Sequence, residues 1–194
     1  MNPLVLRLRD GQEWLRVADP AWADPLDPSY AAEVGGRWNP PHSFPTLYLS
    51  EDLPTARAQV LKLLAGSPVE PEDLDQGFDL VLATLPRSQD VADALSDQGL
   101  EALSLPDTYP DHRNGRPVRH ETCQPVGAEV HALGVRGVYA RSAVIPDGAG
   151  RELAWFPARA DSQATPVRSL GFEEWWFSQV TERTTSGSWA HIRA

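Results

Sequence analysis

The sequence is poor in cysteine, in lysine and in long apolar runs. Its one cysteine, Cys123, can form no disulfide within the chain, and the five histidines include no pair at i, i+4 spacing, so the pattern of a zinc site is missing. No apolar segment reaches the length of a membrane span or of a signal-peptide core. We therefore expect a cytoplasmic protein that binds no metal and no membrane.

Positive charge is also scarce. Lysine and arginine together number 17 against 27 aspartates and glutamates, which leaves a net charge of −10, and Lys62 is the single lysine. Nucleic acids and anionic lipids repel such an acidic chain, so we expect no direct binding of nucleic acid. An anionic ligand would need a local site built from arginine, whose planar guanidinium binds phosphate or carboxylate through two hydrogen bonds.

Length and hydrophobic pattern indicate one α+β domain. The chain has 194 residues, 41% of them hydrophobic, and no internal repeat or linker divides it, so residues 1–194 are treated as a single domain. Short apolar runs predict strands at 3–9, 46–50, 78–85, 137–145, 152–156 and 165–170. Capping signals predict helices between Asp52 and Gly66, over 88–100 and over 124–133, with irregular segments at 19–45 and 105–120.

The segment Gly35-Gly36-Arg37-Trp38-Asn39 is the most informative motif. Two glycines let the backbone approach a ligand closely, and an arginine beside them suits a pyrophosphate group. The same residues also fit a glycine turn with a surface arginine and a core tryptophan. Spacing alone leaves both interpretations open.

Two polar side chains stand in otherwise apolar surroundings. Gln59 shares a helix face with Ala56, Val60 and Leu63, where an unpaired amide would cost about 1–3 kcal/mol. It therefore either bonds to the backbone or lines a cleft. Ser142 ends the strand GVYAR before a Pro-Asp-Gly turn, where its hydroxyl can face a ligand, and no Gly-x-Ser-x-Gly elbow marks it as a hydrolase nucleophile.

Two further clusters allow a functional explanation but favour an ordinary one. His112, His120, Cys123 and His131 lie within 20 residues, which suggests metal or Cys-His chemistry, although surface-loop histidines and a core thiol account for them better. The aromatic run FEEWWF near the C-terminus fits core packing or an interface. Exposure of its tryptophans would favour the interface.

Taken together, these motifs resemble a known family. GGRWNPP, the strand TLYLS, the helix with PTARAQV, and GVYARSAVIP leading to ELAWF are similar, in this order, to the RES domain, from about Trp14 to Phe156. The resemblance implies a fold like that of ADP-ribosyltransferase toxins, a central split β-sheet flanked by helices, with residues 157–194 as an extension. Members are toxins of bacterial toxin–antitoxin pairs that consume NAD or transfer ADP-ribose from it. An Xre-type antitoxin neutralises them by binding over or into the active cleft.

The resemblance also assigns residues to NAD binding. The family arginine falls on Arg37, and a second arginine of the N-terminal segment falls on Arg16, so both are expected to bind the pyrophosphate. Tyr48, from the strand TLYLS, is expected to place the nicotinamide end. Trp38 and Asn39 complete the GGRWN part of the expected site.

The catalytic positions contain one departure from the family. The family serine falls on Ser142, which would bond near the reacting ribose, but the family glutamate falls on Gln59. Cleavage of the nicotinamide–ribose bond passes through a cationic transition state, and losing one stabilising contact slows a reaction about 10²- to 10³-fold. We therefore expect NAD binding with an impaired reaction, unless Glu51, Glu121 or Glu152 supplies the missing acid.

Three explanations of this glutamine stay open. It is an inactivating change that allows a toxic protein to be produced, a natural variant with another acid, or the mark of a natural pseudo-enzyme. In the last case the chain would be a catalytically inactive binding module that engages an Xre-type antitoxin. The acceptor of ADP-ribose (water, phosphate or a protein side chain) and the formation of homo- or hetero-oligomers are equally open.

Overall fold

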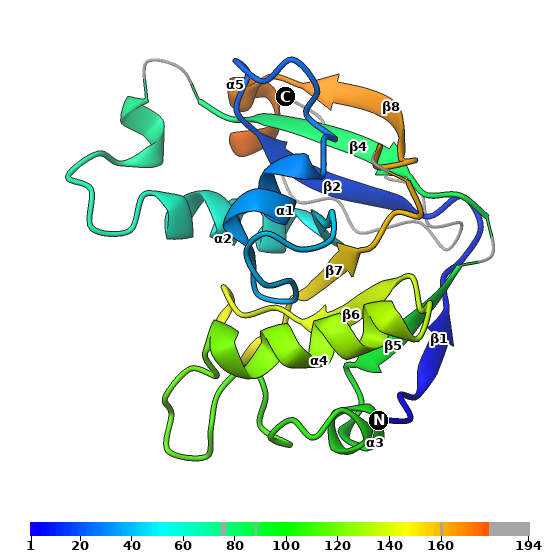
Figure 1. Ribbon diagram of the computed structural model, residues 1–194. Coiled ribbons are helices and arrows are strands. Elements are labelled where there is room, and N and C mark those ends of the chain that lie inside the picture. The colour runs from blue at the N-terminus through cyan, green and yellow to red at the C-terminus, as the bar shows by residue number, and fades with distance from the viewer. Residues whose placement is uncertain (75–76, 88, 160, 179–194) are drawn as a thin grey trace.

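A computed structural model shows one eight-stranded sheet with helices packed against it (Figure 1). It describes residues 1–74, 77–87, 89–159 and 161–178. The strands are β1 (Val5–Arg7), β2 (Glu13–Ala18), β3 (Leu47–Ser50), β4 (Asp79–Thr84), β5 (Asp90–Ala94), β6 (Gly137–Arg141), β7 (Arg151–Trp155) and β8 (Thr165–Leu170). The α-helices are α1 (Ser29–Val34), α2 (Leu53–Leu63), α3 (Asp97–Ala102), α4 (His120–Ala132) and α5 (Phe172–Trp176). The predicted α+β class is confirmed.

The sheet is nearly divided in two. Its strands lie in the order β1-β5-β6-β7-β3-β2-β4-β8, and β5 runs parallel to β6. Strands β2 and β3 are joined by one residue pair, Leu15 with Ser50, whereas β2 pairs with β4 along its whole length. The half formed by β2, β4 and β8 therefore twists away from the half formed by the other strands (Figure 1). This narrow junction gives the sheet its split form.

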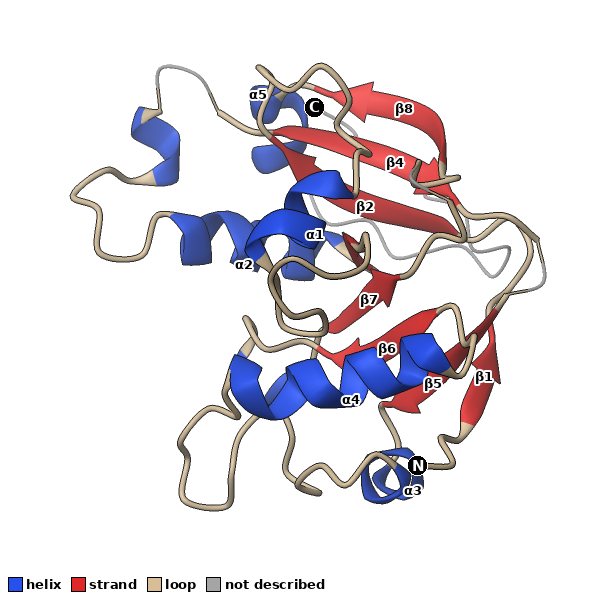
Figure 2. Ribbon diagram, viewed as in Figure 1, coloured by secondary structure: helices blue, strands red, loops and turns tan. Residues whose placement is uncertain are grey.

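Helices cover both halves and the junction between them. Helix α4 lies along β5 and β6, while α1 and α2 lie near the division (Figure 2). The apolar face of α4 belongs to one core cluster with residues of β5 and β6, and that of α2 to another with residues of β2 and β4. No helix in the described ranges has the length and apolar character needed to cross a membrane.

The helix predicted after Asp52 is confirmed. The Asp52 carboxylate accepts a hydrogen bond from the backbone N–H of Thr55 at 2.7 Å, which caps α2. Pro54 lies in the first turn, where a missing N–H breaks no helical hydrogen bond. The helix ends at Leu63, shortly before Gly66 with its φ of 86°. Local signals at both ends thus place this helix beside β3.

The helix predicted over 88–100 is wrong. Residues 90–94 form β5, which pairs with β1 and β6, and only the short helix α3 follows. The acidic residues that suggested a first helical turn have other partners. Asp90 forms an ion pair with Arg7 at 2.8 Å, and Asp93 accepts hydrogen bonds from backbone N–H groups of the next turn. Pairing with two distant strands therefore outweighs a local helix signal.

Helix α4 begins four residues earlier than the predicted start at 124. The added turn ends at Cys123, which is fully buried and continues the apolar face formed by Val126 and Val130. Burial of the Cys123 side chain in the core stabilises the longer helix, while the other three added residues are exposed. As a result Pro125 lies inside the helix rather than at its first position.

Several other boundaries differ from the prediction. The strand expected over 3–9 is shortened to β1, and the one expected over 137–145 ends at Arg141. The pattern predicts no element at 13–18 or 29–34, where β2 and α1 form. The aromatic run forms α5, in which Trp175 is fully buried and donates to the Phe78 carbonyl at 2.7 Å, so core packing is its role. The end of the expected extension, from residue 179, lies outside the described residues.

Candidate functional site

A cavity of about 710 Å³ opens where the two halves of the sheet meet. Its walls come from β2, β3, α1 and α2, from the loops that contain Gly36 and Ala143, and from the segment that leads into α4. Sites for small molecules typically occupy about 300–1,000 Å³. The junction therefore holds a cavity of ligand size that is built from distant parts of the chain.

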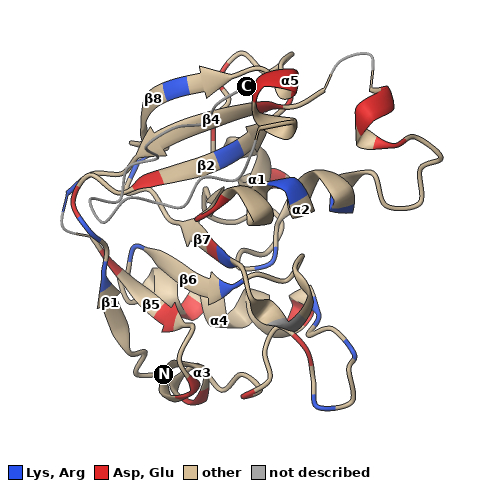
Figure 3. Ribbon diagram, turned by 180° about the vertical axis from the view of Figure 1, so that it is seen from behind, with Lys and Arg blue, Asp and Glu red and all other residues tan. Residues whose placement is uncertain are grey.

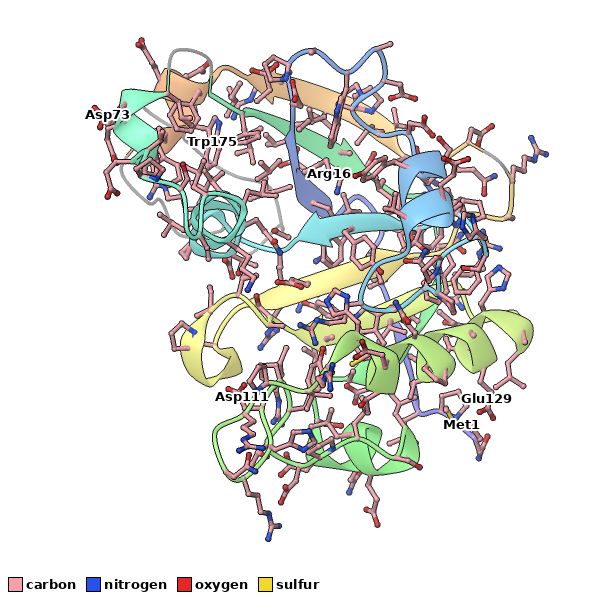
Figure 4. All side chains as sticks on the ribbon, turned by 60° about the vertical axis from the view of Figure 1, so that its left-hand side comes forward. Met1, Arg16, Asp73, Asp111, Glu129 and Trp175 are labelled. Atoms are coloured by element: carbon pink, nitrogen blue, oxygen red, sulfur yellow. The ribbon has the colours of Figure 1, made fainter. Side chains whose placement is uncertain are left out.

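Arg16 reaches from β2 toward α1 and lines this cavity (Figure 4). Its Nη1 donates a hydrogen bond to the Tyr48 carbonyl oxygen at 3.0 Å, and its buried Nε has no partner among the described residues. Burial lowers the pKa of Arg16 to about 10, partly offset by attraction to Tyr48. The guanidinium is therefore still charged at neutral pH and retains an unused donor.

Arg37 supplies a second guanidinium to the same cavity. Its Nη1 donates to the Val118 carbonyl oxygen at 2.8 Å and lies 4.0 Å from the Cys123 sulfur. Within the described ranges, neither Arg16 nor Arg37 forms an ion pair with an acidic side chain. Backbone oxygens thus hold both cations in place without neutralising them.

Tyr48 lines the cavity with its ring, while its hydroxyl is engaged in the GGRWN loop. The hydroxyl donates to Asn39 Oδ1 at 2.7 Å and accepts from the Trp38 backbone N–H at 2.9 Å. Burial raises the pKa of Tyr48, so the phenol stays protonated. A Cβ on Gly36 would overlap this ring, which means that the second glycine is required for the packing of Tyr48.

Trp38 and Asn39 do not reach the cavity surface. Trp38 is buried against Tyr109, with ring centroids 5.8 Å apart. Asn39 is fully buried and donates from Nδ2 to the Ala31 carbonyl oxygen at 2.5 Å. Both therefore fix the loop and Tyr48 from behind. The core-tryptophan interpretation of the motif holds, while Arg37 faces the cavity.

Gln59, Ser142 and Glu152 form a polar cluster at one wall of the cavity. The Gln59 amide donates to Glu152 Oε1 at 2.9 Å, and the Ser142 hydroxyl donates to the same oxygen. Gln59 and Glu152 line the cavity, whereas Ser142 is fully buried behind them. Burial raises the pKa of the Glu152 carboxyl, and the Ser142 hydrogen bond and the charge of Arg37 oppose that rise. Gln59 thus bonds to a side chain and faces a cleft.

Comparison with known proteins decides the family. A family model described as the RES domain matches residues 6–178. The chain belongs to the RES domain family. Among curated proteins no sequence matches it significantly. The RES domain is also similar to a chain of the crystal structure of the M. tuberculosis MbcT–MbcA toxin–antitoxin complex, with 24% identity, a TM-score of 0.69, and coverage of 88% of this chain and 90% of that chain. At this identity the likeness shows a shared fold.

The RES domain brings most of its sequence-predicted site residues together. Arg16, Arg37, Tyr48 and Gln59 line one cavity, and Ser142 touches its wall through Glu152. Of the candidate substitute acids, Glu152 and Glu121 line the cavity. Glu51 does not line the cavity, and its carboxylate instead accepts a hydrogen bond from the Tyr139 hydroxyl at 2.5 Å. The sequence therefore predicted residues that come together at one cavity, but not which acid lies beside them.

The mouth of the cavity contains aromatic and basic residues that the sequence did not single out. Trp22 and Tyr30 line it and are 44% and 67% exposed. The lining includes Lys62 and Arg119, so that Lys and Arg number four there against three acidic residues. Elsewhere Lys and Arg are scattered over strands, helices and loops (Figure 3). The signal available was the proline-rich stretch before GGRWN, whose irregularity marked a functional loop without naming its residues.

His120, Cys123 and His131, which lie close in sequence, have different environments in the fold. His131 stacks on Phe44 with centroids 4.0 Å apart, and His120 lines the cavity mouth. Cys123 is buried, which raises the pKa of its thiol. In the part of the chain that is described, no three metal-ligating side chains come close enough to hold an ion.

Proposed function

We propose that this RES domain binds NAD and cleaves its nicotinamide–ribose bond as the toxin of a toxin–antitoxin pair. The observation that carries the proposal is the pair of half-buried guanidinium groups, Arg16 and Arg37, which face one cavity and, in the described residues, have no acidic ion-pair partners. Desolvated cations of this kind favour an anion, and arginine suits the oxygens of a pyrophosphate. The single free cysteine is compatible with action in the reducing cytoplasm.

The remaining walls suit the other parts of NAD. With the pyrophosphate on the two arginines, the exposed rings of Trp22 and Tyr30 offer an aromatic platform for the adenine. We assign the nicotinamide end to Tyr48, which lines the same cavity. The ribose between them would lie beside the polar cluster that contains Glu152.

The reaction needs positioning and charge rather than a covalent intermediate. The bond from ribose C1′ to the nicotinamide nitrogen breaks, nicotinamide leaves with the bonding electrons, and C1′ gains positive character. An acceptor oxygen, from water, phosphate or a protein side chain, then bonds to C1′ and gives up its proton if it carries one. A fixed carboxylate near C1′ stabilises the cationic transition state electrostatically.

An antitoxin is the second expected partner. The RES domain shares its fold with a chain from a toxin–antitoxin complex, and we infer that an Xre-type antitoxin binds over the cavity mouth. Exposed apolar side chains stand there and on the adjoining helices, among them Tyr30, Val34 and Leu63. Their burial would supply part of the binding free energy, as aromatic and apolar residues do at interface centres.

The test is binding and turnover of NAD. We expect calorimetric titration to show NAD binding by the wild type, with an affinity loss of about 10- to 100-fold in Arg37→Ala, since a hydrogen bond to a charged group contributes about 1.5–3 kcal/mol. Arg168→Ala, which changes an exposed arginine of β8, should bind NAD normally. Arg37→Lys keeps the positive charge but lacks the planar guanidinium group. Its NAD affinity should lie between those of the wild type and Arg37→Ala.

One outcome would refute the proposed function, and another would restrict it to binding without catalysis. No binding at millimolar NAD, together with unchanged growth of cells that express wild type or Arg37→Ala, rules out the NAD-dependent toxin. Binding without nicotinamide release by the wild type or by Gln59→Glu supports the catalytically inactive binding module instead.

A further inference from the structure

We propose that Glu152 of strand β7 is the catalytic carboxylate of this chain and takes the place of the family glutamate that is missing at Gln59. The inference rests on the proposed cleavage of NAD and names the group that stabilises the reacting ribose. It also implies that Gln59 does not silence the site, in contrast to the impairment expected from sequence.

Glu152 lies beside the position of the missing family glutamate. Glu152 pairs with Ser50 of β3 in the central part of the sheet, and its side chain lines the cavity together with Gln59 from α2. The Gln59 amide nitrogen and Glu152 Oε1 are 2.9 Å apart. A carboxylate on β7 therefore lies within one hydrogen-bond length of the place where a glutamate on α2 would carry its charge.

The hydrogen bonds leave part of this carboxylate free for substrate. Both Gln59 Nε2 and the Ser142 hydroxyl donate to Oε1. The Ala143 backbone N–H is a third donor to the carboxylate. Its two oxygens together offer about four lone pairs, so the group can still accept a hydrogen bond from a ribose hydroxyl. Ser142 in turn accepts from the Val144 backbone N–H at 3.2 Å, which holds the hydroxyl in its donating orientation. Gln59 and Ser142 are thus positioning residues for Glu152.

A purely structural role explains Glu152 poorly. A desolvated carboxylate is costly unless an ion pair and hydrogen bonds compensate it. Within the described residues Glu152 has two side-chain donors, the Ala143 backbone N–H and the attraction of Arg37, but no direct ion pair. A glutamine would accept the same two hydrogen bonds without a buried charge. Retaining a charged group at such a place is typical of a functional site, where stability is lower than the fold could achieve.

The chemistry follows from the charge alone. As nicotinamide leaves, the ribose becomes positively charged, and the Glu152 carboxylate stabilises it across the cavity without forming a bond to it. The same carboxylate accepts a hydrogen bond from a ribose hydroxyl and keeps the sugar oriented. In this chain the hydrogen-bonded pair therefore has its amide on α2 and its carboxylate on β7.

The experiment is an exchange of the two side chains. Nicotinamide release, NAD affinity by calorimetry and melting temperature are measured for wild type, Gln59→Glu, Glu152→Gln, Gln59→Glu/Glu152→Gln and Glu152→Asp. We expect Glu152→Gln to lower kcat by about 10²- to 10³-fold, with the NAD dissociation constant changed only a few-fold and the melting temperature equal or higher. The double variant should regain most of the lost rate, because it restores one carboxylate and one amide at hydrogen-bond distance.

Glu152→Asp provides a second test in case Glu152→Gln fails to fold. It keeps the charge but withdraws the carboxylate by one methylene group, and we expect a lower kcat with unchanged NAD affinity. A wild-type kcat in Glu152→Gln or in Glu152→Asp overturns the proposal. So does a folded, NAD-binding double variant that is as slow as Glu152→Gln.

The outcomes separate this inference from the proposed function. Equal NAD cleavage by wild type and Glu152→Gln refutes the role of Glu152 and leaves the NAD-cleaving toxin intact. Cleavage that appears only in Gln59→Glu also refutes it, because the wild-type carboxylate then does no catalysis. Absence of NAD binding in all variants instead refutes the proposed function, and the role of Glu152 falls with it.

Discussion

Single residues of the cavity carry charge in surroundings that offer few charged partners. Arg16 and Arg37 are anchored by backbone oxygens, and Glu152 by an amide and a hydroxyl. Hydrogen bonds hold each group in place, and the charges of Arg37 and Glu152 also attract each other. Fixed dipoles and charges in a desolvated cavity act strongly on a ligand, since little solvent has to reorganise around them.

The ionisation of Glu152 should set the acid side of the pH–rate profile. Burial raises its pKa above the ordinary glutamate value, which Asp52 reinforces and Arg37 opposes, while the facing phenols of Tyr48 and Tyr109 stay neutral. Because the reaction needs the ionised form, we expect kcat for NAD to fall on acidification at a higher pH than an ordinary glutamate would give. The residual activity of Glu152→Gln should not show this fall of kcat on acidification.

The same shift predicts a pH dependence of stability. The native state binds the Glu152 proton more tightly than the unfolded chain does, so its contribution to the free energy of unfolding falls as the pH rises from the ordinary glutamate value through the raised pKa. Urea denaturation at several pH values measures this slope, and Glu152→Gln should lack it. An unchanged pH–rate profile and slope in that variant would contradict the assignment of the titration to Glu152.

Among the helices and strands, α4 contains a proline that lowers the stability of the fold. Pro125 is exposed and lies in the sixth position of the helix, where it offers no N–H to the preceding turn. We expect Pro125→Ala to raise the free energy of unfolding by about 1–3 kcal/mol, since proline is about 3 kcal/mol worse than alanine inside a helix.

Pro54→Ala is the matched control for that measurement. Pro54 is also exposed but lies in the first turn of α2, where its missing N–H has no helical acceptor, so the stability should change little. Thermal or urea unfolding of both variants tests the difference. Equal effects at the two positions would show that Pro125 does not strain α4.

The elements also show how far local sequence signals extend. Asp52, Pro54 and Gly66 predicted α2 correctly because a cap and a stop act within the helix itself. The acidic run before residue 95 predicted a helix where β5 forms, because pairing with β1 and β6 is decided far away in the chain. Strand β2 was missed for the same reason, since its partners β3 and β4 come 29 or more residues later.

Some residues of the candidate site could be predicted from a local motif, whereas others come together only through the order of the strands. Arg37 and Tyr48 could be predicted, since the loop and the strand that hold them are close in sequence. The bond between Gln59 and Glu152 joins residues 93 positions apart and depends on the order of strands in the sheet. A hairpin prediction for β6 and β7, in which Arg141 faces Arg151, would have brought Ser142 near Glu152, but it could not have added α2.

At the scale of the whole molecule, a ligand in the cavity should hold the two halves of the sheet together. Arg16 belongs to β2 and Tyr48 and Glu152 to the other half, while one residue pair joins β2 to β3. We expect NAD at 100 times its dissociation constant to stabilise the fold by about 2.7 kcal/mol, seen as a higher melting temperature.

Hydrogen exchange locates that stabilisation. Added NAD should increase protection of the β2 and β3 amides more than that of the distant strand β1, and Arg37→Ala should require more NAD for the same effect. A similar rise in melting temperature for Arg37→Ala at equal NAD concentration would contradict binding in this cavity.

Strand β7 is made late in synthesis but lies between β3 and β6, two strands completed before it. Until a ribosome has translated past residue 155, those two strands have no common neighbour and the wall that contains Glu152 does not exist. Whatever reaction the cavity performs is therefore withheld from the growing polypeptide and begins only once most of the chain has left the ribosome. On the proposed function, this is the interval in which a cell can supply the antitoxin.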